Sequence, residues 1–200
     1  MTTNVLLPAS AEPKWSVRRL GILAMLGAPM LFVEVVVFVT SDHPNRNSPL
    51  VGITGLLYLA GWICSLVALR RLGVLGPSVA ARTVYWIQIG LIATAAMLST
   101  QELLYGSAEK LPLPVLDLAW PLSHTFMLVT GGFAIASDVW KGWRRVAPFL
   151  PGLKIPLLLT LMALGAGNGQ GLAGSIQATW ASFAFLLLGY AVFTSSDRPR

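Results

Sequence analysis

The stretch VGITGLLYLAGWICSLVAL, residues 51–69, contains no charged side chain and is followed directly by Arg70 and Arg71. A helix needs about 20 mostly apolar residues to cross the hydrocarbon core of a bilayer. An uncharged stretch of this length that stops at a pair of arginines is typical of a transmembrane helix. Residues 51–69 therefore predict a membrane span, and the rest of the chain is interpreted outward from them.

The composition of the whole chain supports this interpretation. Of its 200 residues, 55% are hydrophobic and only 11% are charged, against about 25% charged residues in ordinary soluble domains. This scarcity of charge excludes a soluble globule, a disordered chain and a fibrous repeat. The single cysteine, Cys64, excludes an intramolecular disulfide.

Six segments are apolar enough to be membrane helices, which predicts an all-α polytopic integral membrane protein with a bundle of six transmembrane helices. The predicted spans are residues 20–40, 51–69, 83–104, 115–137, 146–167 and 174–193, within a transmembrane domain of residues 20–194. The fifth segment is the weakest, because it carries three prolines and Lys154 in its first half. We expect the long side chain of Lys154 to reach the lipid headgroups from the start of its helix.

The basic residues predict the orientation of these spans. Eleven of them fall in the segments on one side of the predicted membrane, and they are Lys14, Arg18, Arg19, Arg70, Arg71, Arg82, Lys141, Arg144, Arg145, Arg198 and Arg200. Because cytoplasmic loops are enriched in Lys and Arg, both the N-terminal segment 1–19 and the tail 195–200 are predicted to be cytoplasmic. The predicted location is the cell membrane. We therefore interpret the net charge of +6 as a signal for membrane orientation and not as a sign of nucleic-acid binding.

Four ionisable residues are candidates for a binding site. Glu34 is the one acid deep within a predicted span, and an ionised side chain there costs about 2.5–3.5 kcal/mol, so we expect it to be neutral. Glu102 ends the third span, Asp117 starts the fourth, and His124 follows seven residues later on the same helical face. All four project to the outer half of the predicted bundle.

Two hypotheses explain this group. In the first, a polar cavity opens to the outside with Glu34 and His124 near its floor, and Glu34 binds a proton or a cation. Tyr58 and Trp62 would then form part of the wall, since a spacing of four places them on one helical face. In the second, Glu102 and Asp117 lie at wet helix ends. His124 is then a satisfied core histidine, and Glu34 is protonated and bonded to a neighbour, which fixes helix packing. Tyr58 and Trp62 are a packed core pair.

The hypotheses lead to three function classes. The first is a small transporter or ligand-binding membrane protein, with a small molecule or ion as ligand and the lipid bilayer as surroundings. The second is a non-catalytic scaffold or partner subunit that acts through helix packing, and the third is an acid/base membrane enzyme without a cofactor. No catalytic motif, metal motif or cofactor motif is present in the sequence, and the sequence does not indicate an oligomeric state.

Small residues at four-residue spacing predict close helix packing. The pairs are Gly61 with Ser65, Gly132 with Ala136, and Gly174 with Ala178. Small side chains at this spacing let two helix backbones approach each other in lipid. We expect these pairs to mark contacts between helices within the bundle; the alternative is a dimer face, which nothing else in the sequence indicates.

Overall fold

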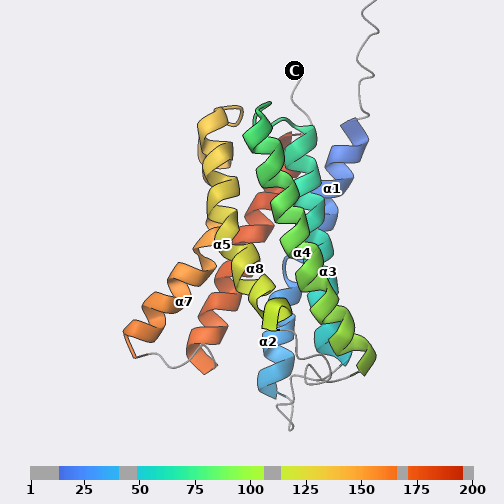
Figure 1. Cartoon of the computed structure of the whole chain (residues 1–200), viewed down its shortest axis with the longest axis vertical. Coiled ribbons are helices and arrows are strands. Elements are labelled where there is room, and N and C mark those ends of the chain that lie inside the picture. The colour runs from blue at the N-terminus through green and yellow to red at the C-terminus, as the bar shows by residue number, and fades with distance from the viewer. Residues whose placement is uncertain (1–13, 41–48, 106–113, 166–170, 196–200) are drawn as a thin grey trace, which may run out of the picture.

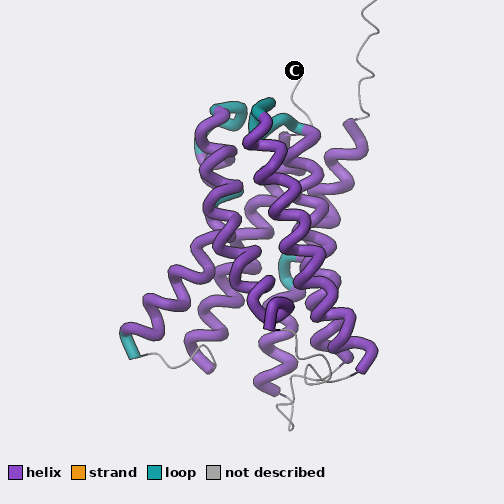
Figure 2. The backbone as a smooth tube through the Cα atoms, in the orientation of Figure 1, coloured by secondary structure: helices purple, strands orange, loops and turns teal. Residues whose placement is uncertain are grey.

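The computed structural model describes residues 14–40, 49–105, 114–165 and 171–195. Nearly all of these residues are helical, and no strand occurs among them, as Figure 2 shows. The prediction of an all-α fold is confirmed.

Five helical stretches are long and apolar enough to cross a membrane. They are Val17–Val36, Pro49–Arg71, Val79–Gln101, Leu118–Ser137 and Leu172–Ser195. Large apolar side chains such as Leu26, Met97 and Phe183 are exposed on their surfaces. A soluble protein rarely exposes this much apolar surface, whereas lipid covers it at no cost. The chain is therefore a multi-pass membrane protein.

Helix α3 (Pro49–Arg71) lies at the centre of the bundle. It packs against α1 (Lys14–Gly27), α2 (Met30–Thr40), α4 (Val79–Tyr105) and α8 (Gly171–Ser195). Both Tyr58 and Trp62 point into this core, and each is about 1% exposed. Helix α3 also has the highest mean hydropathy of the five candidate spans among the described residues.

The helices alternate in direction between the two ends of the bundle (Figure 1). The starts of α1 and α4 and the ends of α3 and α8 lie together at one end. We call it the basic end, because Arg18, Arg70, Arg82 and Arg145 are located there, and we call the opposite end the far end. Which side of the membrane each end faces, and the count of six spans, remain predictions.

The first span is broken in its middle. Helices α1 and α2 are separated by a turn at Ala28 and Pro29, because proline cannot donate the backbone hydrogen bond that would continue the helix. The break lies beside a close approach of this span to α3. A methyl group on Gly27 would lie 2.8 Å from the Cα atom of Gly61, so the predicted close contact at Gly61 is confirmed.

The fifth segment is not one helix over residues 146–167. It consists of α6 (Trp143–Val146), a turn of 3₁₀ helix, η2 (Leu150–Leu153), and α7 (Lys154–Ala163). Three prolines interrupt the backbone ladder in and around these short helices. The segment still leads the chain from the basic end to the far end (Figure 1), although its apolar helical part, Leu150–Ala163, is shorter than the other spans.

Two glycines hold this segment against α5 (Pro114–Ser137). A methyl group on Gly131 would lie 2.3 Å from the Cα atom of Phe149, and one on Gly152 would lie 2.6 Å from the backbone nitrogen of Leu128. At Gly132, by contrast, a methyl group would meet nothing within 4 Å. The predicted contact at Gly132 is therefore wrong, since the neighbouring glycine makes the close approach instead.

Candidate functional site

His124 lies in the core of the bundle, on α5, and its side chain is fully buried. Its Nδ1 atom is 2.8 Å from the backbone oxygen of Trp120. A carbonyl oxygen only accepts hydrogen bonds, so Nδ1 carries the proton and donates it. In the neutral ring, Nε2 is then an acceptor that faces the hydroxyl group of Tyr58 at 2.9 Å. The geometry thus selects one tautomer of neutral His124.

Lys154, the first residue of α7, reaches the same ring. Its side chain is only 8% exposed, and Nζ lies 3.3 Å from Nε2 of His124. Nζ also lies 5.6 Å above the centre of the Trp120 ring, a favourable place for a cation. The prediction that Lys154 extends to the headgroups is wrong, because the breaks before α7 bring its start into the packed core.

Glu34, on α2, is the acidic member of this group. It is half-buried, and its carboxylate acts electrostatically on both Lys154 and Tyr58. A negative charge on Glu34 would offset part of the cost of burying the ammonium group of Lys154, whereas the neutral form expected from the sequence would not. The same two side chains, Lys154 and Tyr58, contact His124. We call Glu34, Tyr58, His124 and Lys154 the central polar cluster.

Aromatic rings enclose the cluster. Trp120 stacks on Tyr58 with their ring centres 5.9 Å apart. The ring centre of Trp62 lies 4.7 Å from the ring centres of both His124 and Phe185. The ring nitrogen of Trp62 donates a hydrogen bond to the sulfur of Met127. Both residues predicted as a wall, Tyr58 and Trp62, therefore contact His124 directly. Their role in a ligand pocket stays a prediction.

A second polar link fixes the position of α5 beside the cluster. The side-chain nitrogen of Gln88, on α4, donates a hydrogen bond to the backbone oxygen of Ser123 at 3.0 Å. The hydroxyl group of Thr130 donates one to the side-chain oxygen of Gln88 at 3.3 Å. All three residues are fully buried. The sequence offered no signal for Gln88 beyond an amide within an apolar helix.

The other two predicted residues lie on helices that reach the far end. Glu102 belongs to α4 and Asp117 to α5, but their side chains lie outside the described part of the structure. Their contribution to a pocket remains a prediction. Among the residues that the structure describes, no group of three or more His, Cys, Asp or Glu side chains could hold a metal ion.

The cluster combines four kinds of polar group in one apolar setting. A carboxyl, an ammonium, an imidazole and a phenol come from four different helices, α2, α7, α5 and α3. Such a set can exchange protons or bind a charged ligand, and small displacements of α2 or α7 would change the contacts of Glu34 and Lys154. Comparison with models of protein families, with curated proteins and with solved structures finds no match, so the chemistry of the site is inferred from its geometry.

Proposed function

We propose that this protein is a small transporter or ligand-binding protein of the cell membrane, with the central polar cluster as its site. The contact of Lys154 Nζ with Nε2 of His124, which Tyr58 shares, carries this proposal. Glu34 acts as the protonatable carboxylate, and it exchanges either a proton or the positive charge of a ligand.

The energetic cost of the cluster favours a task over simple packing. A charged side chain in the middle of a membrane costs about 2.5–3.5 kcal/mol even on insertion scales. Apolar residues of similar volume often stabilise a protein as well as a buried ion pair does. A cluster that holds both Glu34 and Lys154 is therefore costly to stability, which favours a function that uses these two groups.

The backbone around the cluster also favours a transporter. Lys154 starts a short helix after an interrupted segment, and Glu34 follows the break at Ala28 and Pro29 by about one and a half turns. Transporter sites are commonly built near the middle of the membrane, at discontinuous helices whose parts move relative to one another. Breaks in two separate segments allow such motion here.

A packing role is the second candidate, and one observation favours it. Both ring nitrogens of His124 already have partners, as a structural histidine requires. In that case the cluster would specify how α3, α5 and α7 fit together, and the protein would act as a scaffold or partner subunit.

A ligand screen combined with charge variants distinguishes the two functions. The purified protein is screened for a rise in thermal midpoint with ions, lipids and metabolites, because a ligand that binds only the folded state stabilises it. The hits are then measured on E34Q, K154Q and the double variant E34Q/K154Q. Each single variant leaves one charge without its counterpart and is expected to lose stability, whereas the double variant, which removes both charges, regains part of the loss.

The double variant separates folding from function. If the cluster is the ligand site, E34Q/K154Q folds but no longer responds to the ligand that stabilises the wild type. A double variant that responds like the wild type would remove the cluster from the function. A wild type that responds to no ligand, together with the stability pattern above, would support the packing role.

The orientation of the protein is tested independently. Reporter fusions after Arg200 and at Asn47 are expected to place the C-terminus in the cytoplasm and the loop at Asn47 outside, as the distribution of basic residues predicts. A C-terminus outside the cell would reverse the side from which the cluster is approached.

A further inference from the structure

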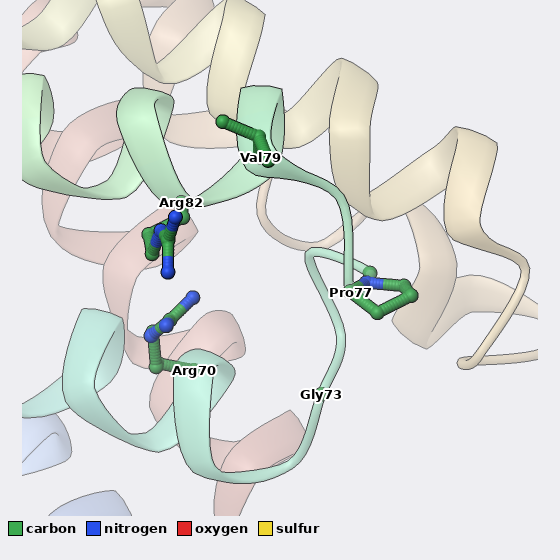
Figure 3. A pocket seen from close by; sticks show the side chains of 6 residues that line it. Arg70, Gly73, Pro77, Val79 and Arg82 are labelled. Atoms are coloured by element: carbon green, nitrogen blue, oxygen red, sulfur yellow. The ribbon is translucent and has the colours of Figure 1, made fainter.

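A cavity of about 390 Å³ lies at the basic end, far from the central polar cluster, beside the loop that joins α3 to α4. Its lining consists of Arg70, Gly73, Gly76, Pro77, Val79 and Arg82. Figure 3 shows that the side chains of Arg70 and Arg82, which come from different helices, point toward each other across it. The lining thus brings two guanidinium groups to one space.

In the described part of the chain, neither Arg70 nor Arg82 forms an ion pair with an acid. The ion pairs of Lys141 and Arg145 with Asp138 lie in a different loop. Two facing guanidinium groups repel each other, and an anion between them would attract both and outweigh that repulsion. The planar N–H groups of arginine suit the paired oxygens of phosphate particularly well.

The geometry of the cavity is held in place by packing. The guanidinium of Arg70 lies 5.4 Å above the ring centre of Tyr85, which is itself buried. The hydroxyl group of Ser137 on α5 donates a hydrogen bond to the backbone oxygen of Val74 and anchors the loop. Within the loop, Gly76 adopts φ 85°, a conformation that other residues rarely adopt. These contacts hold the loop that lines the cavity, while Arg70 and Arg82 are themselves exposed to its open side.

The start of α4 adds a further positive contribution. Val79, the first residue of α4, lines the cavity, and the Ser78 hydroxyl caps the helix by accepting a hydrogen bond from the Ala81 nitrogen at 3.0 Å. The amino end of a helix carries a partial positive charge that favours phosphate. Two arginines and a helix start thus act on the same space.

An exposed tryptophan near the cavity favours a position at the level of lipid headgroups. Trp86 follows Arg82 by about one turn and is 61% exposed, and exposed tryptophans favour the boundary between lipid and water. Basic pockets at this level between membrane helices bind anionic headgroups. We propose that the cavity between Arg70 and Arg82 binds a phosphate group, either that of an anionic phospholipid or that of a water-soluble phosphate ester.

The test measures lipid binding to the delipidated protein by native mass spectrometry. The probes are dioleoylphosphatidylglycerol, zwitterionic dioleoylphosphatidylcholine as the control lipid, and glycerol 3-phosphate as a soluble competitor. The proteins are wild type, R70Q/R82Q and R19Q. Arg19 is exposed on α1 at the same end and does not line the cavity, so R19Q controls for the loss of one surface charge.

The wild type is expected to prefer phosphatidylglycerol, and R70Q/R82Q to bind it at least about tenfold more weakly, because charge-assisted hydrogen bonds are lost. R19Q is expected to bind like the wild type. Displacement by glycerol 3-phosphate would identify a soluble phosphate ester as the ligand source, and resistance to it would identify the lipid.

Equal binding by wild type and R70Q/R82Q would overturn the proposal, as would an equal loss in R19Q, which would indicate general surface charge. If R70Q/R82Q fails to fold, because Arg70 packs on Tyr85, the single variant R82Q decides the question. Unchanged affinity in R82Q would then overturn the proposal.

Discussion

Replacement of Gly131 by alanine tests whether α5 positions the interrupted segment that carries Lys154. The added methyl group would lie 2.3 Å from the Cα atom of Phe149 and 2.6 Å from its nitrogen. Ordinary contacts between carbon atoms are about 3.5–4.0 Å. The obstacle is backbone rather than a flexible side chain, so the two segments must separate.

The expected size of the effect follows from two opposing terms. Overpacking of this kind costs about 1–3 kcal/mol, and a clash with backbone places Gly131→Ala at the upper end. Alanine recovers about 1 kcal/mol of helix propensity relative to glycine. The net loss is therefore about 2 kcal/mol, which corresponds to a fall in thermal midpoint of about 4–8 °C for a chain of this length.

The neighbouring residue supplies a matched control. A methyl group on Gly132 would meet nothing within 4 Å, so Gly132→Ala is expected to keep or slightly raise the midpoint. Thermal unfolding of both variants in the same detergent is the measurement. Equal midpoints for the two variants would refute the close contact between α5 and the residues that precede Lys154.

Two further predictions concern single polar groups. Tyr58→Phe removes the hydroxyl group that donates to Nε2 of His124 but leaves Lys154 beside that nitrogen. Thermal unfolding should therefore show that the free energy of unfolding falls by only about 0.6–1 kcal/mol. A fall of more than about 3 kcal/mol would contradict this arrangement. At the basic end, a hydrogen bond from Lys141 keeps the pKa of the exposed Asp138 below its ordinary value. Its stabilising effect is therefore present above the unfolded-state pKa of about 3.9 and is lost as the pH falls through the lower folded-state pKa. The fall in thermal midpoint between about pH 6 and about pH 3 should then be smaller in Asp138→Asn than in the wild type. An equal fall in the two proteins would exclude this contribution.

The sequence was sufficient for the class of the protein and for most of its helices. Four of the predicted spans, residues 51–69, 83–104, 115–137 and 174–193, fall within the long helices α3, α4, α5 and α8. Hydropathy is summed along a local stretch of chain, so no knowledge of the fold is needed to recognise such segments. The fifth span was less predictable, because its prolines break the helix without removing its apolar character.

The candidate site was only half predictable. Glu34 and His124 stood out because ionisable groups in apolar segments are costly, and Tyr58 and Trp62 because of their shared helical face. Lys154 was assigned to the headgroups, since a lysine near a helix start normally extends there. Gln88 gave no signal, because a single amide in a span is compatible with many partners.

The sequence by itself determined that this protein lies in a lipid bilayer, because its charges are scarce and its apolar stretches are long. Its basic residues also predict an orientation. What only the tertiary structure decided was which side chains meet. Tyr58 and His124 are 66 positions apart, and His124 and Lys154 are 30 apart. A membrane helix is apolar on both its lipid face and its packed face, so its sequence pattern does not reveal which face turns inward. The close approach at Gly27 fixes how α1 meets α3, and the one at Gly131 fixes how α5 meets the segment before Lys154, which reaches His124 in the core.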